Sequence, residues 1–147
     1  PRARGAIFGL TRGTTRAHLV RAALEAIAYQ TVDAVDAMQA ATGLRLEELH
    51  ADGGATANAW LMQFQADVLG VPVVVPEVTE TTALGAGLLA GIAVGSWRID
   101  ELDGVWHESA RFEPRMGEAQ RAALLGEWRR SLSSTRERGE PGDGVPV

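Results

Sequence analysis

The sequence predicts a mixed α/β domain with a partly parallel sheet. Segments with helical apolar periodicity alternate with short β-branched runs, which is typical of layered α/β structures. The 147 residues match the length of one domain, and 46% hydrophobic with 22% charged residues is an ordinary globular composition. Strong strand segments are few for a complete doubly wound domain, so we expect a small domain or a piece of a larger one.

The first half begins with an expected short strand, Ala6–Leu10, which has a glycine at each side. Thr14 or Thr15 is the expected N-cap of a long helix that runs to about Ala41 and ends at Gly43. Three- and four-residue spacing predicts that this helix buries one apolar stripe. The stripe consists of Val20, Leu24, Ile27, Val35 and Met38.

A strand over Leu46–Ala51 is expected next, followed by a helix that starts near Ala57 and stops at Gly70. This helix should direct Leu61, Phe64 and Val68 inward. Val71–Val75 is a β-branched run between two prolines and predicts a strand. Thr81 and Thr82 should cap a helix over Ala83–Val94 that ends at Gly95. Small residues recur at every fourth position, which favours close packing of this helix against a neighbour: Ala83, Gly87, Gly91 and Gly95.

Secondary-structure signals are weaker after Ser96. Ile99–Leu102 indicates a turn or short helical turn, and Glu113–Met116 indicates a connector. Gly117–Leu132 has helical character, with Leu124, Leu125 and Trp128 on its apolar side. We expect residues 1–132 to form the domain and 133–147 to be a disordered tail, because the tail is rich in Ser, Gly, Pro and charge.

Composition excludes several classes of site. The net charge is −5 and no basic stripe exists, so neither a nucleic acid nor an anionic membrane is an expected partner. All 14 basic residues are Arg, which excludes a Schiff-base or P-loop lysine, and the absence of Cys excludes a thiol nucleophile. The three histidines lack metal-ligand spacing. Without a long apolar span or a signal peptide, we expect a cytoplasmic protein.

The most informative segment runs from Asp52 through Gly53 and Gly54 to Asn58. Two glycines between a strand and a helix let the backbone turn sharply and approach a ligand without an intervening Cβ. The helix start offers free N–H groups, and Asn58 can both donate and accept hydrogen bonds. The alternative is an ordinary strand-to-helix turn with a capping Asn, and on the residues alone this alternative is favoured.

Six segments of the chain form a recognisable signature: Gly5–Leu10, His18–Glu25, Ile27–Thr31, Asp52–Ala55 with Asn58, Leu61–Gln65 and Thr82–Ala86. Together they resemble the C-terminal signature of the FGGY family of carbohydrate kinases, and within it the glycerol kinases in particular. The resemblance extends from about Arg4 to Trp128.

The resemblance implies the C-terminal lobe of the actin and heat-shock-chaperone ATPase superfold, which is ribonuclease-H-like, as part of an incomplete two-lobed kinase. ATP or ADP would bind in the cleft between the lobes, and the positions matching nucleotide contacts are Gly53, Gly54 and Asn58. This implication favours the nucleotide interpretation of the turn over the ordinary one.

The family's catalytic aspartate, first phosphate loop and glycerol-binding residues belong to the segment that precedes this one. We therefore assign no catalytic residue here, expect Mg²⁺ and glycerol to be bound mainly by residues outside this chain, and expect the chain alone to be inactive. The full-length protein would form a homo-oligomer. Two alternatives stay open: a lobe of a xylulose or gluconate kinase, and a non-catalytic nucleotide-binding or assembly module.

Overall fold

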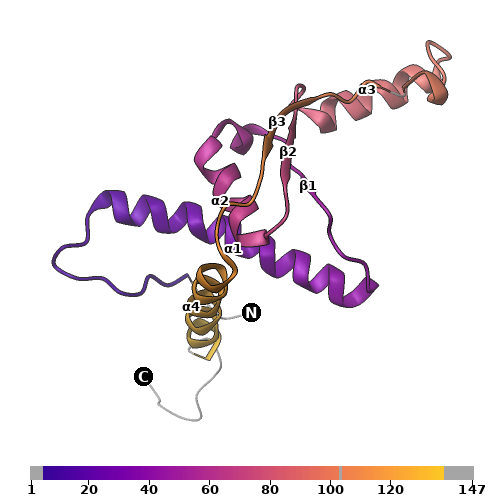
Figure 1. The fold of residues 1–147 in the computed structure, drawn as a ribbon. Coiled ribbons are helices and arrows are strands. Elements are labelled where there is room, and N and C mark those ends of the chain that lie inside the picture. The colour runs from indigo at the N-terminus through magenta and orange to yellow at the C-terminus, as the bar shows by residue number, and fades with distance from the viewer. Residues whose placement is uncertain (1–4, 103, 138–147) are drawn as a thin grey trace, which may run out of the picture.

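The computed structural model describes residues 5–102 and 104–137 (Figure 1). Its elements, in chain order, are α1 (Arg16–Thr42), β1 (Leu49–His50), a 3₁₀ helix (Gly54–Ala57), α2 (Ala59–Leu69), β2 (Val73–Pro76), α3 (Thr81–Ala93), a second 3₁₀ helix (Ile99–Leu102), β3 (Glu108–Phe112) and α4 (Glu118–Glu137). The alternation confirms the predicted α/β class, and the predicted helical turn over Ile99–Leu102 is confirmed.

The strands form a three-stranded sheet in the order β1-β2-β3. β1 runs parallel to β2, with Leu49 opposite Val73, whereas β3 runs antiparallel to β2, with Arg111 opposite Val74. All four residues of the central strand β2 are buried. The predicted strands at β1 and β2 and the partly parallel sheet are confirmed, although β1 is shorter than expected.

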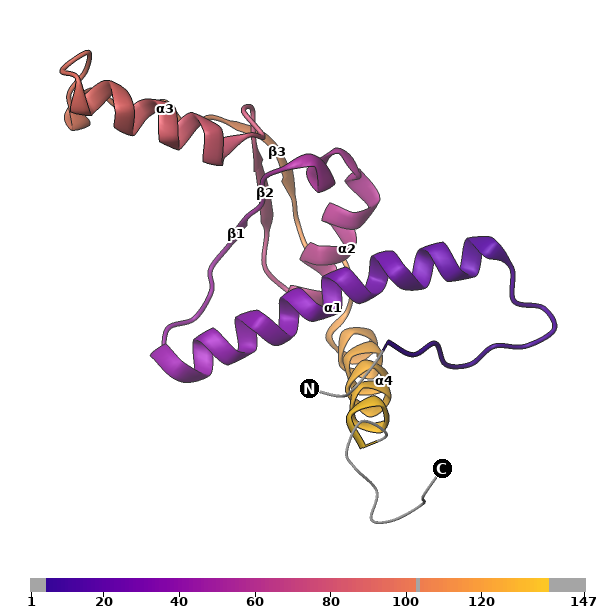
Figure 2. The same cartoon turned by 180° about the vertical axis from the view of Figure 1, so that it is seen from behind.

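α1, α2 and α4 pack on one another, and α2 lies on the sheet. α2 contacts β2 and β3, α1 packs on α2, and α4 also contacts α2 (Figures 1 and 2). Leu61, Phe64 and Val68 of α2 are buried as predicted. Gly70, with φ of +75°, ends α2 in the left-handed region that favours glycine. Leu124, Leu125 and Trp128 pack against the same core, which confirms the predicted apolar side of α4.

The predicted ends of α1 are confirmed, but its predicted buried face is largely wrong. Thr15 is the N-cap and Gly43, with φ of +71°, follows the last residue. The buried residues are Ala28, Tyr29, Val32 and Val35, with Leu24 partly buried beside them. Val20, Ile27 and Met38 are 50–61% exposed. The reason is that α1 is apolar on more than one face while its partner α2 covers only one, so periodicity alone could not choose the face.

Ala6–Leu10 is not a strand, which corrects the prediction. An extended segment becomes a strand only when a neighbouring strand accepts its hydrogen bonds, and the described sheet contains only β1, β2 and β3. Conversely, β3 was not predicted, because its sequence Glu108–Phe112 is charged and only partly alternating. It is held in place by its pairing with β2, a long-range contact that local patterns do not reveal.

The predicted tail begins too early. α4 continues through Ser133 to Glu137, and within it the Ser134 and Thr135 hydroxyls donate to carbonyl groups one turn earlier on the helix. Residues 138–147, the remainder of the predicted tail, lie outside the described residues.

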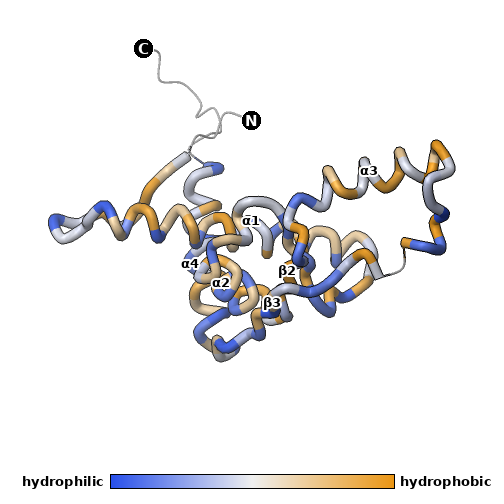
Figure 3. The backbone as a smooth tube through the Cα atoms, turned by 90° about the horizontal axis from the view of Figure 1, so that it is seen from above, coloured by the Kyte–Doolittle hydropathy of each residue, from blue (hydrophilic) through white to orange (hydrophobic). Residues whose placement is uncertain are grey.

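α3 projects away from the rest of the molecule (Figures 1 and 2), and its apolar residues are visible along the tube in Figure 3. Of its small residues only Gly91 is closely packed, because the Trp97 indole covers it and donates from Nε1 to the Leu88 carbonyl oxygen at 2.9 Å. A Cβ at Gly87 would meet nothing within 4 Å. The predicted close packing of the small residues is thus found at Gly91 alone among those of α3. The N-cap of α3 is Glu80 rather than Thr81 or Thr82.

Tyr29 is the centre of the contact between α1, α2 and α4. Its ring meets Phe64 edge-on with centroids 5.6 Å apart and stacks on Trp128 at 5.5 Å. The Trp128 indole in turn donates to Asp33 Oδ2 at 2.7 Å. Burial, together with the nearby carboxylates of Glu25 and Glu127, raises the pKa of Tyr29 to about 12. The three helices therefore hold the phenol in its neutral form.

This shift predicts a loss of stability at high pH. In the unfolded chain Tyr29 should release its proton near its ordinary pKa of about 10. The folded chain keeps the proton up to a pKa of about 12. The contribution of the neutral Tyr29 phenol to the free energy of unfolding is therefore complete below about pH 10 and is lost as the pH rises toward 12. Because the chain has one Tyr and no Lys or Cys, no other side chain with an ordinary pKa titrates in this window.

We expect the urea concentration at the unfolding midpoint to decrease as the pH is raised from 10 to 12. The midpoint of the Tyr29→Phe variant should decrease less, because the variant keeps the ring packing without the phenol. Tyrosinate absorbance of the folded chain checks the pKa directly. A titration midpoint at the ordinary value in the folded protein would contradict the prediction.

Candidate nucleotide-binding site

The turn that follows β1 is fixed by hydrogen bonds at Gly53. Gly53 has φ of +81° and ψ of 176°, a backbone region that only glycine adopts readily. Its N–H donates to the Thr79 carbonyl oxygen at 2.7 Å, and its carbonyl oxygen accepts from Thr56 Oγ1 at 2.7 Å. Thr56 itself is buried. The turn is therefore held in one conformation by the chain around it.

Gly54 differs from Gly53. It is exposed, its φ is not positive, and a Cβ placed on it would meet no atom of the described residues within 4 Å. Neither backbone conformation nor packing within the described chain therefore requires a glycine here. The missing side chain leaves the backbone open to close approach by a ligand.

Asn58 is the N-cap of α2. Its side-chain Oδ1 accepts a hydrogen bond from the Leu61 N–H at 3.1 Å, so the ordinary capping interpretation is correct for this oxygen. The side-chain amide nitrogen has no hydrogen-bond partner among the described residues. The capping role and a ligand role are thus compatible, because they use different atoms of the same side chain.

The structure adds a contact that sequence reasoning missed. The Thr81 hydroxyl, at the first residue of α3, donates to a carboxylate oxygen of Asp52. Together with the Gly53–Thr79 bond, this contact ties the turn after β1 to the segment after β2. No local sequence signal connects Asp52 with Thr81, because they are 29 residues apart.

His18 and His50 lie in separate environments. His18 accepts the Thr15 N–H at 3.0 Å on Nδ1 and so helps to cap α1. His50 contacts Glu48 at 2.7 Å and stacks on Trp106. The pKa of Glu48 is lowered by its hydrogen bonds, first from His50 and then from Arg111. Among the described residues, no cluster of three or more His, Cys, Asp or Glu could hold a metal ion.

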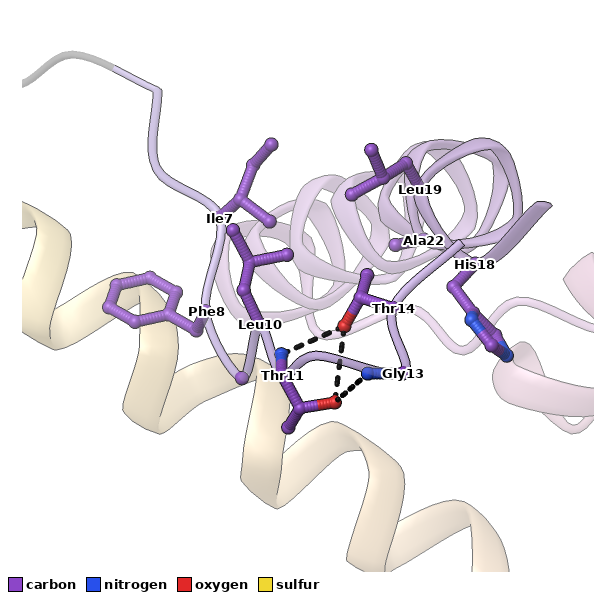
Figure 4. A pocket seen from close by; sticks show the side chains of 10 residues that line it. Ile7, Phe8, Leu10, Thr11, Gly13, Thr14, His18, Leu19 and Ala22 are labelled. Carbon is purple, nitrogen blue, oxygen red and sulfur yellow. Dashed lines mark hydrogen bonds between the residues drawn. The ribbon is translucent and has the colours of Figure 1, made fainter. Parts of the chain in front are cut away.

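A hollow of about 410 Å³ lies between the Thr11–Thr14 loop and the first turns of α1 (Figure 4). The Thr11 N–H donates to Thr14 Oγ1 at 2.9 Å, so the loop satisfies its own polar groups. Apolar side chains, among them Ile7, Leu10 and Leu19, line much of the remainder. None of the predicted site residues lies in this hollow.

The family model for the FGGY family of carbohydrate kinases, C-terminal domain, matches residues 1–94, more than half of the chain. The chain belongs to this family. No helix among the described residues is long and apolar enough to cross a membrane.

Curated relatives of this FGGY chain include two named glycerol kinase. The protein from Dechloromonas aromatica is 60% identical over 133 residues, which are 90% of this chain and 26% of the relative. The protein from Deinococcus radiodurans is 54% identical over 136 residues, which are 92% of this chain and 27% of the relative. The chain therefore spans about a quarter of the length of these relatives.

Solved structures of FGGY kinases share the fold. Plasmodium falciparum glycerol kinase, crystallised with ADP, superposes with a TM-score of 0.79 at 36% identity, covering 90% of this chain and 27% of its own. Xylulose kinase from Rhodospirillum rubrum gives a TM-score of 0.74 at 26% identity, covering 95% and 29%. The predicted fold class, part of a lobe of the actin and heat-shock-chaperone ATPase superfold, is confirmed.

The two glycines of the turn should respond differently to substitution. We expect Gly53→Ala to lower the free energy of unfolding by about 1–3 kcal/mol, because it places a Cβ in a region of φ and ψ that is essentially restricted to glycine. Gly54→Ala, the matched control, should change it by less than about 0.5 kcal/mol, since its Cβ enters open space. Urea unfolding of the two variants measures the difference, and equal losses would contradict the assigned backbone geometry.

Proposed function

We propose that the chain is the ATP-binding C-terminal portion of a glycerol kinase, which transfers the γ-phosphate of ATP to glycerol and gives sn-glycerol 3-phosphate. The observation that carries the proposal is the identity of 54–60% with proteins named glycerol kinase, over at least 90% of this chain. The proposal places the reaction in the cytoplasm and includes a homo-oligomeric full-length protein.

In this proposal the turn after β1 contacts the nucleotide. Gly54 offers an exposed backbone without a side chain, and the neighbouring Gly53 sets the direction of that backbone. Asn58 offers the amide nitrogen that its capping role leaves unused. Support comes from the open space at Gly54 and from the ADP with which P. falciparum glycerol kinase was crystallised.

The remaining parts of the reaction are assigned to residues outside the described chain. We assign the ligands of Mg²⁺ mainly to residues outside this chain, since no group of three or more His, Cys, Asp or Glu among the described residues could hold a metal ion. The base and the glycerol pocket are likewise assigned to the remainder of the enzyme. Phosphoryl transfer depends on positioning the nucleophile, the metal-bound phosphates and the base together, so this portion would contribute nucleotide binding and orientation.

Glycerol is favoured over the alternative substrates by the degree of likeness. The glycerol kinase structure is 36% identical, whereas a gluconate kinase is 24% and xylulose kinases are 24–26% identical. No observation in the described part of the chain favours a non-catalytic module.

The 147-residue chain alone should form no ADP above the enzyme-free control when given ATP, Mg²⁺ and glycerol, because it spans about a quarter of its relatives. The chain joined to the upstream sequence that the proposal implies should turn over glycerol. A coupled ADP assay measures both, with xylulose and gluconate as competing substrates. Turnover by the isolated chain would show that the catalytic base lies within it. A preference for xylulose or gluconate would overturn the assignment of glycerol as the substrate.

In the full-length kinase, Gly54→Val should raise the KM for ATP by filling the space above the turn, while the KM for glycerol stays within about twofold of the parent. Asn58→Asp should also raise the KM for ATP, because it keeps the oxygen that caps α2 but replaces the free amide donor. The loss of one hydrogen bond corresponds to a roughly 2- to 12-fold weaker affinity for the nucleotide.

Steady-state kinetics with circular dichroism test these two variants. An exposed position away from the turn, Ala86→Val, provides a matched control for added volume. If both site variants kept the parent KM for ATP while folded, Gly53 and Gly54 would form a purely structural turn.

A further inference from the structure

We infer that Thr81 and Asp52 are positioning residues that hold the Gly53–Gly54 turn ready for the nucleotide. The inference rests on the proposed function, since it concerns the same turn. The side chains of Asp52 and Thr81 would not touch the nucleotide. They would act by holding the backbone of the turn that lies beside it.

Two hydrogen bonds tie the turn to a different element. The Gly53 N–H donates to the Thr79 carbonyl oxygen at 2.7 Å, and the Thr81 hydroxyl donates to the Asp52 carboxylate. The bond from Thr56 Oγ1 to the Gly53 carbonyl oxygen is internal to the turn and its helix. Only the first two bonds therefore fix the turn relative to the segment that follows β2.

A turn with two adjacent glycines needs such external bonds. Glycine has more backbone freedom than any other residue, so an unrestrained Gly-Gly turn loses more entropy when a ligand orders it. Bonds that order the turn beforehand lower this cost and raise ligand affinity. The Asp52–Thr81 contact is suited to this role, because it restrains the residue directly before Gly53.

The surroundings of the pair argue for a local effect on the turn. Asp52 is exposed and Thr81 is half-buried, and exposed hydrogen bonds contribute little to global stability. α3 is attached to the turn at its first residue, while Gly91 is its only buried residue. Removing the Thr81 hydroxyl should therefore loosen the turn without disturbing the core around Tyr29.

The test uses the full-length kinase and measures the Kd for ADP by calorimetry, together with the KM for glycerol. Thr81→Val, which removes the hydroxyl at nearly constant volume, should raise the Kd for ADP about two- to tenfold and leave the KM for glycerol within about twofold. Thr81→Ser should restore the parent Kd. Thr82→Val is the matched control, because Thr82 is exposed and makes no side-chain hydrogen bond among the described residues.

A double-mutant cycle identifies the bond. Asp52→Ala should raise the Kd as Thr81→Val does, and the double variant should be no worse than the weaker-binding single variant, because both remove one interaction. Asp52→Asn retains an acceptor oxygen for the Thr81 hydroxyl and should therefore keep the parent Kd for ADP, which makes it the matched control for the alanine variant. A parent Kd in folded Thr81→Val protein, or additive effects in the double variant, would overturn the inference. Normal ADP binding without glycerol-dependent turnover would overturn the proposed function alone, and absence of ADP binding in the parent would overturn both.

Discussion

The parallel pairing of β1 with β2 is the constraint on which the site depends. Parallel strands end at the same edge of a sheet, so the segments that follow them are brought together there. The turn Asp52–Gly54 follows β1, and Thr79–Thr81 follows β2. Their two hydrogen bonds are a consequence of this pairing, which places residues almost 30 positions apart within contact. β2 can serve both neighbours because all its residues are buried between them and under α2.

The helical core fixes the other side of the same turn. α2 begins at Asn58, directly after the turn, and its buried face carries Phe64 against the ring of Tyr29. Trp128 of α4 covers that ring from another side and is itself held by Asp33 of α1. The turn thus lies between a strand anchored in the sheet and a helix anchored in the core. This arrangement explains how an exposed glycine such as Gly54 can have a defined backbone position.

Sequence patterns correctly predicted the features that depend on interactions between residues close together in the chain. The ends of α1 and α2 followed from Thr15, Gly43 and Gly70, because caps and left-handed glycines act within a few residues. The Gly53–Gly54 turn was predicted for the same reason. The buried face of α1, the strand β3 and the contact between Asp52 and Thr81 were not predicted, since each depends on a partner far away in the sequence. The open space around Gly54 also required coordinates.

The charge of the Asp52–Gly54 turn determines which part of a nucleotide can lie beside it. The chain has no Lys, and the described turn contributes an exposed carboxylate, Asp52, and otherwise neutral groups. An unpaired phosphate beside Asp52 would be repelled, whereas the uncharged base and ribose would not be. Under the proposed function, the backbone at Gly54 and the amide of Asn58 would therefore contact the adenosine part of ATP rather than its phosphates. Under the proposed function, the cations that neutralise those phosphates must come from outside the turn, because the turn itself supplies no positive charge.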